Sequence, residues 1–392
     1  MKSKSPGVNT ICTHIGQLKD EQYKGASSPL YMSSSYAYEN VDVQRYPRYF
    51  NTPNQEGLAK KVAALEHCEA GLIFGSGMAA ISHTMLAFLQ QGDHVVVQKT
   101  IYGGAYNFMV EEFPKYGISY DFTDGFAETD FRNKIKPNTR VIYVETPSNP
   151  LMLITDLEMI SRLAGEYNLV SIIDNTFASP INQTPTDFGI DIIIHSATKY
   201  MGGHSDLCAG AVAASEEHIK KIWNVGKNLG GSLSDYTVWL LERSMKTMGI
   251  RVKAQNRNAR KIAKWLNAHS LVKKVYYPGL REHPDHELAK KQMRGYTGML
   301  SFELVRGVDP NKFMQSLSLI KQSTSLAGVE STILSPAKTS HSLLTAAERE
   351  RQGISDGLLR FSIGIENKDD LIADLEHAFR EVSRHQLQKS LV

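Results

Sequence analysis

The sequence is poor in cysteine, with three among its 392 residues: Cys12, Cys68 and Cys208. They lie far apart in the chain and form no C-x-x-C pair, so a disulfide framework or a zinc knuckle is not expected and a reducing compartment is favoured. Long apolar runs are also missing, and none approaches the roughly 18–20 residues that span a bilayer. The first residues carry lysines without the apolar stretch of a signal peptide. We therefore expect a cytoplasmic protein that does not bind membranes.

Neither sign of charge is in excess. The chain has 44 Lys and Arg against 41 Asp and Glu, a formal net charge of +3. This balance gives no electrostatic argument for a nucleic-acid partner, and the basic helix expected over 251–274 has no interleaved aromatic platform. His14, His67, His83 and His204 lack metal-ligand spacing, so no metal site is expected.

The opening segment, residues 1–55, has little hydrophobic periodicity and is rich in Ser, Tyr, Pro and Asn. Its many aromatic side chains argue against a disordered tail. A long segment without its own core that is nevertheless ordered must pack on something else. We expect an N-terminal arm that docks on a neighbouring subunit.

Residues 56–245 alternate short, β-branched apolar segments with amphipathic ones. This alternation predicts a parallel sheet covered by helices on both faces. Ligands of such sheets bind outside the carboxyl ends of the strands. The expected strands are 70–74, 94–98, 140–145, 169–174, 191–195 and 209–214, and the expected helices are 55–67, 78–91, 107–114, 156–167 and 216–228.

The pattern changes in residues 246–392, where a long basic helix is followed by alternating strands and a closing helix over 368–385. The acidic residues near the start of the closing helix and the basic ones near its end suit the helix dipole. These features predict a second, smaller α/β domain with an antiparallel sheet. Its expected strands are 273–278, 298–305, 320–326 and 358–366.

Polar side chains follow two neighbouring strands of the first domain. Asp174 ends a buried strand, where a carboxylate needs a cation or hydrogen-bond donors. The next strand leads into Ser196, Thr198 and Lys199. A lysine near buried surface can serve as an amine nucleophile. Taken singly, the aspartate could equally be a cap or half of an ion pair, and the lysine a solvated side chain.

A glycine-containing turn, FGSGMAA over 74–80, joins an expected strand to an expected helix. The start of that helix offers backbone N–H groups to an anion such as phosphate. The turn also fits a dinucleotide-binding fingerprint, which requires an acidic residue about 20 residues further on. Gln98, Lys99 and Thr100 stand there instead, so an NAD-binding oxidoreductase is the weaker alternative. Tyr102, on the loop after the second strand, could cover a flat ring or pack in the core.

Together these residues match the needs of one cofactor. Pyridoxal 5'-phosphate requires a lysine for its aldehyde, an acidic partner for its ring nitrogen, and amides and hydroxyls for its phosphate. Lys199, Asp174 and the turn at 74–80 would supply these groups from one edge of one sheet.

Four longer motifs carry a family resemblance: VIYVETPSNP, IIDNTFASP, IHSATKYMGGHSD and SLAGVES. With them the chain, from residue 8 to residue 380, resembles the cystathionine γ-synthase/γ-lyase family of pyridoxal-phosphate enzymes. The resemblance implies fold type I, with a mostly parallel seven-stranded sheet in the large domain and an antiparallel sheet in the smaller C-terminal domain.

The resemblance also implies roles for individual residues. Lys199 would hold the cofactor as a Schiff base and then, once released, take the substrate α-proton, with Tyr102 stacking on the ring and assisting proton transfer. Asp174 would pair with the ring nitrogen. The phosphate ligands would be Gly77, Met78, Ser196 and Thr198, together with Tyr46 and Arg48 reaching across from a neighbouring subunit. A dimer with shared active sites follows, and such dimers usually pair into a homotetramer.

For the substrate, the resemblance assigns Arg360 to the α-carboxylate, assisted by Asn149 and Ser325. Glu330 matches the acidic residue of γ-acting members, although it could also be a solvated side chain. We therefore expect γ-elimination or γ-replacement on a sulfur amino acid or a homoserine ester, as in cystathionine γ-lyase or γ-synthase. Cystathionine β-lyase, methionine γ-lyase and homoserine-ester sulfhydrylase remain alternatives.

The sequence departs from the family pattern at four places. Pro47 stands between Tyr46 and Arg48, where the family usually has Ser or Thr, and the usual Asn-Pro-Thr is Asn51-Thr52-Pro53. The usual Met-Thr-His is Thr339-Ser340-His341. Methionine γ-lyases usually place Cys after the Tyr-Gly pair, whereas Gly104 follows here, which disfavours a specialised methionine lyase.

Overall fold

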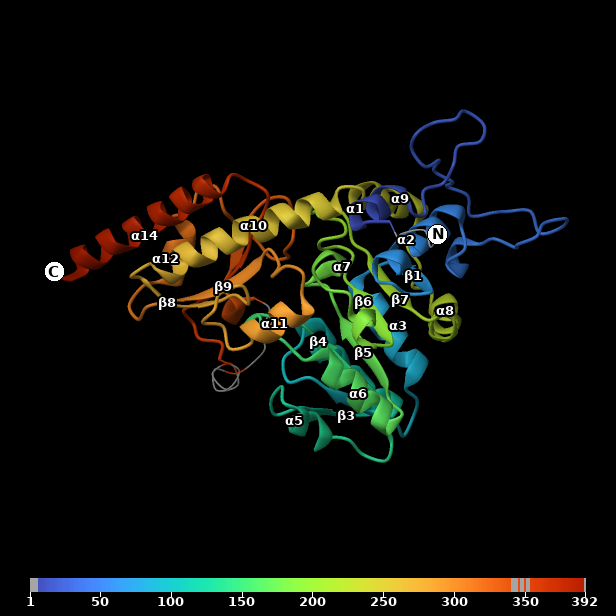
Figure 1. Ribbon diagram of the computed structural model, residues 1–392, viewed down its shortest axis with the longest axis horizontal. Helices are drawn as coiled ribbons and strands as arrows, with labels where there is room; N and C mark the ends of the chain where they lie inside the picture. The colour runs from blue at the N-terminus through green and yellow to red at the C-terminus, as the bar shows by residue number, and fades with distance from the viewer. Residues whose placement is uncertain (1–5, 340–344, 346–348, 350–352, 391–392) are drawn as a thin grey trace. The chain divides into compact units, whose positions relative to one another are not determined.

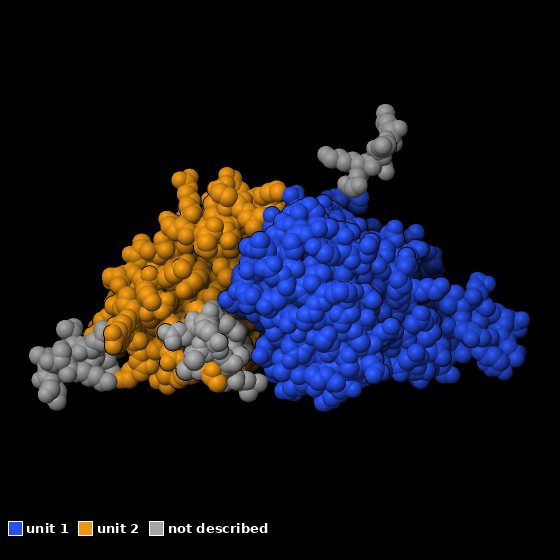
Figure 2. Space-filling view, turned by 90° about the horizontal axis from the view of Figure 1, so that it is seen from below, with its two compact units in different colours: residues 1–145, 155–250 blue, residues 146–154, 251–392 orange. Residues whose placement is uncertain are grey.

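The computed structural model describes residues 6–339, 345, 349 and 353–390. The chain divides into two compact units, coloured separately in Figure 2. Unit 1 comprises residues 1–145 and 155–250, and unit 2 comprises 146–154 and 251–392. The division falls within helix α10 (Met248–Asn267), and the short segment 146–154 groups with the C-terminal unit.

Unit 1 is built on a seven-stranded sheet of order β1-β7-β6-β5-β4-β2-β3. Strands β3, β2, β4, β5 and β6 are parallel, while β7 runs antiparallel to both β6 and the edge strand β1. The expected mostly parallel sheet of fold type I is therefore confirmed. The strands are β1 (Ala70–Phe74), β2 (His94–Val97), β3 (Ser119–Phe122), β4 (Thr139–Glu145), β5 (Val170–Asp174), β6 (Ile192–His195) and β7 (Gly210–Ala214).

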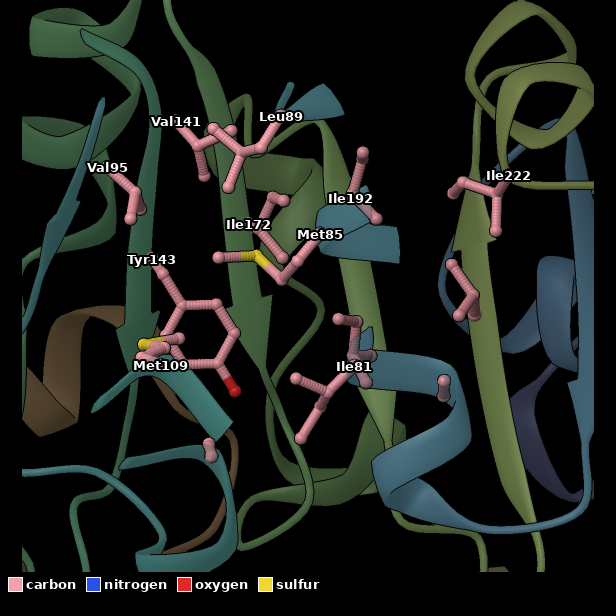
Figure 3. Close-up of a cluster of buried hydrophobic side chains, with 14 of the residues drawn as sticks. Ile81, Met85, Leu89, Val95, Met109, Val141, Tyr143, Ile172, Ile192 and Ile222 are labelled. Carbon is pink, nitrogen blue, oxygen red and sulfur yellow. The ribbon is translucent and has the colours of Figure 1, made fainter. Parts of the chain in front are cut away.

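Helices, among them α3 (Gly77–Phe88) and α6 (Leu157–Tyr167), cover both faces of this sheet, which explains why most side chains of its central strands are apolar. Val95, Tyr143 and Ile172 point to one face and pack against α3, whereas Ile142 and Ile173 point to the other and pack against α6. Figure 3 shows the first layer, with Ile81 and Met85 of α3, and Leu89 just after the helix, among strand side chains. Alternation between the faces holds the carboxyl ends of β4, β5 and β6 in register along one edge.

Side-chain caps begin several helices of unit 1. Ser76 accepts a hydrogen bond from the backbone N–H of Ala79 at the start of α3, and Asp156 accepts one from Met159 at the start of α6. The helices of this unit are α1 (Val8–His14), α2 (Pro53–Leu65), α3 (Gly77–Phe88), α4 (Gly103–Asn107), α5 (Glu128–Arg132), α6 (Leu157–Tyr167), α7 (Ser179–Asn182), α8 (Glu216–Leu229) and α9 (Asp235–Met245), with short turns η1 (Pro47–Tyr49), η2 (Phe108–Glu112), η3 (Phe113–Tyr116) and η4 (Pro185–Phe188).

The N-terminal segment has little regular structure between α1 and α2. In Figure 1 it projects from unit 1 as long loops. Several of its large side chains are exposed, namely Tyr23, Leu30, Tyr31, Met32, Tyr38, Val41, Val43 and Tyr46.

Unit 2 contains a five-stranded sheet of order β10-β11-β12-β9-β8, antiparallel except for the β10–β11 pair. Helices α10 and α14 pack on it, with Ile262 and Phe379 among the buried contacts. The elements are β8 (Val272–Tyr276), α11 (His286–Gln292), β9 (Met299–Leu304), α12 (Pro310–Gln315), β10 (Lys321–Gln322), β11 (Thr332–Leu334), η5 (Pro336–Lys338), β12 (Leu358–Ser362) and α14 (Lys368–Ser390).

Three expectations from the sequence need correction. The helix expected to end at Pro114 continues to Tyr116, because the chain loosens into a π-turn over Phe108–Glu112 and then tightens into a 3-10 turn that accepts proline. The strand expected over 320–326 is reduced to β10, because Ser325 and Ala327 adopt left-handed backbone conformations, with φ of 72° and 65°. Strands β3 and β11 were not expected at all.

Candidate active site

Asp174 is the last residue of β5, and its side chain is buried, with 5% exposed. Its Oδ1 accepts a hydrogen bond of 2.9 Å from the backbone N–H of Thr176. Burial raises the pKa of the Asp174 carboxyl, and the hydrogen bonds from Thr176 and the electrostatic influence of His195 and Lys199 oppose that rise less strongly. A buried carboxylate in this state is stabilised by any further donor or cation that reaches it.

The segment after β6 carries Ser196, Thr198 and Lys199 past the same edge of the sheet. The backbone N–H of Ser196 donates to Thr176 Oγ1 at 2.8 Å, which joins this segment to the one that follows Asp174. The Thr198 hydroxyl donates to the carbonyl of Ala209 at 3.2 Å and accepts from its N–H at 3.0 Å. Thr198 therefore fixes the loop in this structure. Lys199 is half-buried.

Gly77 opens α3 directly against Ser196. A Cβ atom at Gly77 would lie 2.8 Å from Ser196 Cβ and 2.9 Å from its Oγ, so only glycine permits this approach. The backbone N–H groups of Gly77 and Met78 belong to the first turn of the helix, where no helical carbonyl is available to them. Two amides and one hydroxyl thus converge where an anion would meet the positive end of a helix.

Tyr102 precedes α4, and its side chain is 45% exposed. Its backbone N–H donates to Oε2 of Glu145 at 2.6 Å, and Glu145 is the buried last residue of β4. Glu145 pairs in register with Asp174 on β5. The loop that carries the tyrosine is therefore tied to the strand edge that carries Asp174.

Tyr46 and Arg48 lie at the start of the short turn η1 in unit 1. The guanidinium of Arg48 stands over the rings of Tyr46 and Tyr49, at 5.4 and 5.1 Å from their centroids, and its Nη1 donates to the carbonyl of Lys227. Among the described residues, no hydrogen bond or ring contact joins either of them to Gly77 or Ser196.

Unit 2 gathers three of the residues expected to bind substrate. Arg360, on β12, is 5% exposed, and its guanidinium donates to Asn149 Oδ1 at 3.2 Å and to the carbonyl of Ser325 at 3.0 Å. The left-handed backbone of Ser325 is what turns that carbonyl toward the guanidinium, and such strain is typical of functional loops. Glu330 is half-buried, and Ser340 and His341 lie outside the described residues.

The residues of unit 1 fit pyridoxal phosphate better than a dinucleotide. A phosphate would find the amides at Gly77 and Met78 and the hydroxyl of Ser196, a basic ring nitrogen would find the buried Asp174, and an aldehyde would find Lys199. A dinucleotide fold needs its glycine turn after a parallel strand inside the sheet, whereas β1 is an antiparallel edge strand.

Among the described residues no group of three or more His, Cys, Asp or Glu side chains could hold a metal ion. Within the same part of the chain, no helix is both long enough and apolar enough to cross a membrane.

A fold-type-I architecture with this edge of polar groups defines a class of pyridoxal-phosphate enzymes. A family model described as Cys/Met metabolism PLP-dependent enzyme matches residues 9–380, and the chain belongs to that family. Its cofactor is pyridoxal 5'-phosphate, and it is an enzyme of sulfur amino-acid metabolism.

The relatives carry three different activities at nearly equal similarity. An L-methionine γ-lyase of Fusobacterium nucleatum is 41% identical, over 97% of this chain and 100% of its own. A cystathionine β-lyase of Lactococcus lactis is 39% identical, over 95% and 99%. A solved cystathionine γ-lyase of Lactobacillus plantarum, complexed with L-serine, is 38% identical, covers 96% of this chain and 100% of its own, and superposes with a TM-score of 0.93. Overall similarity therefore does not choose among carbon–sulfur lyase activities.

The sequence places Glu145 at the same edge of the sheet as Asp174, but it assigns no role to the residues that tie the segments of the site together. Thr176 and Glu145 follow or end predicted strands, so their position at the sheet edge could have singled them out. Glu66 and His195 form a buried contact across 129 residues of sequence, for which no local pattern exists.

Proposed function

We propose that this protein cleaves L-cystathionine on the γ side, releasing cysteine, 2-oxobutanoate and ammonia with the uptake of one water. The observation that carries the proposal is the meeting of Lys199, Asp174 and the Gly77–Ser196 contact at one edge of the unit 1 sheet. Bound pyridoxal phosphate supplies an electron sink for the carbanion formed at the substrate α-carbon.

Each residue at this edge has a proposed task. Lys199 anchors the cofactor and then, as a free amine, removes the α-proton and returns protons during cleavage. Asp174 keeps the ring nitrogen protonated, because a carboxylate in a buried site is a strong acceptor for an N–H donor. Gly77, Met78 and Ser196 hold the phosphate, Thr198 supports the loop beside it, and the ring of Tyr102 stacks on the cofactor.

Arg360 is proposed to bind the substrate α-carboxylate with the fork of its guanidinium. Asn149 and Ser325 support this role, because their oxygens orient the guanidinium at 3.2 and 3.0 Å. A preoriented guanidinium loses less rotamer freedom when it binds a carboxylate than a flexible side chain would.

Glu330 favours γ over β specificity. Its half-buried position is unlike that of a fully solvated surface glutamate, and a carboxylate there could attract the distal ammonium of cystathionine. β-Cleavage, which releases homocysteine and pyruvate, and γ-cleavage of methionine are the competing specificities.

The deciding experiment is to supply L-cystathionine to the purified enzyme and identify the oxo acid. 2-Oxobutanoate with cysteine supports the proposal. Pyruvate with homocysteine establishes a β-lyase and contradicts it, while leaving the cofactor assignment intact. An O-acyl homoserine ester with cysteine as co-substrate should be tested in parallel, because net formation of cystathionine would identify a synthase.

We also propose a homo-oligomer, usually a homotetramer in this family, in which Tyr46 and Arg48 contact the cofactor phosphate of a neighbouring subunit. Two features support it: the exposed aromatic side chains of the N-terminal segment, and the guanidinium of Arg48 lying near the surface of unit 1. A cytoplasmic location is proposed as well, since Cys12, Cys68 and Cys208 are not joined in disulfides.

A further inference from the structure

A buried carboxylate lies behind the proposed cofactor edge. Glu66 caps the carboxyl end of α2, and its side chain is 0% exposed. Its Oε1 receives two hydrogen bonds, from His195 Nε2 at 2.5 Å and from Asn175 Nδ2 at 2.9 Å. Its Oε2 is buried and has no hydrogen-bond partner among the described residues. A fully buried carboxylate with one oxygen unsatisfied requires compensation from the groups on the other oxygen.

The two donors to Glu66 flank the proposed cofactor ligands in sequence. Asn175 directly follows Asp174, and His195 directly precedes Ser196. Asn175 is itself fixed, because its N–H donates to the carbonyl of Ile194 at 2.9 Å. One carboxylate therefore joins the carboxyl ends of β5 and β6, which carry the acidic and the lysine-bearing segments.

His195 extends this connection to Asp174 by electrostatics. Its ring is 2% exposed, and its Nε2 lies 2.5 Å from Glu66 Oε1. Burial raises the pKa of the Asp174 carboxyl, and His195 and Lys199 both act to lower that pKa. Interactions of this kind are strong because little water screens them.

Other titratable groups face the pair from neighbouring segments. The Cys68 thiol contacts Thr186 Oγ1, and burial raises its pKa to about 12, so it stays neutral. The His67–Asp187 ion pair is about half exposed, with 52% and 42% of the side chains accessible, and is screened by solvent. Cys68 therefore adds no charge beside Glu66, and solvent weakens the influence of the His67–Asp187 pair.

We propose that Glu66 and His195 are positioning residues of the cofactor site, acting on the ring nitrogen of pyridoxal phosphate through Asp174. The proposal rests on the proposed role of Asp174. Glu66 orients the His195 ring and holds the ends of β5 and β6 together, and His195 holds Asp174 in the charged form that accepts the ring N–H. Groups that orient metal ligands in this way typically change metal affinity or activity by about 10- to 100-fold when removed, and we expect an effect of the same order on the cofactor.

The test compares two cofactors on two variants. Glu66→Gln keeps the size and one acceptor oxygen but removes the charge, and His195→Gln keeps a donor toward Glu66 but removes the imidazole. The affinity of each apo-protein is measured for pyridoxal phosphate and for the analogue in which a C–H replaces the ring nitrogen. We expect both variants to bind pyridoxal phosphate at least about 10-fold more weakly and the analogue with unchanged affinity. In the variants loaded with pyridoxal phosphate, the visible absorption band should also change with pH at a different midpoint from that of the unmodified protein.

The matched control is Glu242→Gln. Glu242 is the carboxylate of another buried ion pair of unit 1, with Lys61 at 3.2 Å and with 7% and 0% of the side chains exposed. This variant should lose thermal stability without changing cofactor affinity or the visible band. If Glu66→Gln and His195→Gln behave like Glu242→Gln, or weaken both cofactors equally, the pair is only structural and the proposal is wrong.

Asp174→Asn separates failure of this inference from failure of the proposed function. In one outcome, Asp174→Asn weakens the binding of pyridoxal phosphate and leaves the binding of the analogue unchanged. If the Glu66 and His195 variants then bind both cofactors with unchanged affinity, only the inference fails. If Asp174→Asn also leaves both affinities unchanged, the proposed role of Asp174 fails with it. Should Glu66→Gln not fold, His195→Gln alone decides, because it leaves the buried carboxylate a donor.

Discussion

Glu145 and Asp174 occupy paired positions at the carboxyl ends of the parallel strands β4 and β5, and both side chains are buried. They have different partners: Glu145 accepts from the backbone N–H of Tyr102 at 2.6 Å, and Asp174 accepts from that of Thr176 at 2.9 Å. Burial and, to a lesser degree, these two carboxylates raise the pKa of Tyr143, which keeps that phenol neutral beneath them. One carboxylate thus fixes a loop, which leaves the other for the cofactor.

The first prediction concerns that loop. Glu145→Ala should lower kcat by about 10- to 100-fold, because Tyr102 loses the acceptor that holds its backbone and its ring is no longer set for stacking and proton transfer. Glu145→Gln should restore most of the activity, since an amide oxygen can accept the same hydrogen bond. Steady-state kinetics on the three proteins check this. Equal losses in the Ala and Gln variants would show that the charge, and not the acceptor, matters.

The second prediction concerns Lys199. Lys199→Ala should lower kcat by at least about 10²- to 10⁴-fold, because the group that moves the α-proton is missing. The purified variant should lack the yellow colour of cofactor bound through the lysine, or it should lose its cofactor on dialysis against phosphate. Lys99→Ala, which removes a lysine that donates to the carbonyl of Asp124 at 2.8 Å, is the control and should keep both colour and activity. A coloured, active Lys199→Ala enzyme would falsify the assignment.

The third prediction separates substrate binding from cofactor binding. Arg360→Lys should raise KM for the amino-acid substrate by about 10- to 100-fold, because a single ammonium cannot replace a two-pronged hydrogen bond. Cofactor content should not change. Arg380→Lys, at an exposed position of α14 with 64% of the side chain accessible, is the matched control. Loss of cofactor from Arg360→Lys, with an unchanged KM, would contradict the carboxylate role.

Local pattern predicted the parts of the fold that depend on local burial. Strands β4, β5 and β6 are rich in valine and isoleucine because helices cover both of their faces, and that composition is visible in sequence. Strand β3, SYDF, was missed since it is an edge strand with no fully buried residue, so no apolar run marks it. β11 is only three residues long, too short to show a period.

The cofactor motif was predictable for a different reason. Asp174 ends β5, and Lys199 follows the end of β6. Because β5 and β6 are neighbouring parallel strands, topology alone brings the two residues to one edge of the sheet. The Glu66–His195 contact and the Glu145–Tyr102 tie depend on where a helix end and a loop return to the sheet. Tertiary packing determines where a helix end or a loop contacts the sheet, and the spacing of residues in the sequence does not predict it. The grouping of residues 146–154 with 251–392 is of the same kind.

The fourth prediction tests the shared site. Arg48→Ala and Lys199→Ala should each be nearly inactive alone, because each lacks one contribution to every site. Co-expression of the two should restore activity, since a mixed dimer with two-fold symmetry contains one site with both Arg48 and Lys199; random pairing restores about a quarter of the sites. Specific activity of the mixed preparation is measured against each parent. No recovery, with mixed dimers verified by mass, would place Arg48 and Lys199 in the site of the same chain.

The fifth prediction concerns stability against pH and depends on His83. Its ring is buried, its Nδ1 contacts the carbonyl of Ala79 at 2.6 Å, and its Nε2 has no hydrogen-bond partner among the described residues. Burial lowers the pKa of His83 below its ordinary value of 6.5. Between the two values the unfolded chain binds the extra proton, so the free energy of unfolding rises with pH there, by at most about 1.4 kcal/mol per pH unit for this group. Stability is therefore lost as pH falls below the ordinary value and through the lowered one.

His83→Gln should flatten that dependence, because glutamine does not titrate, whereas His14→Gln at an exposed position should leave it unchanged. The slope of the free energy of unfolding against pH should be reduced and not abolished. Burial also lowers the pKa of His94, His269 and His283, and these histidines contribute to the slope with the same sign. Urea titrations between about pH 5 and pH 8 give the free energy of unfolding for the three proteins. The slope, and not the absolute stability, decides, because the substitution also alters packing against Phe74, whose ring centroid lies 5.3 Å from that of His83. An unchanged slope in His83→Gln would mean that His83 titrates alike in the folded and unfolded chains.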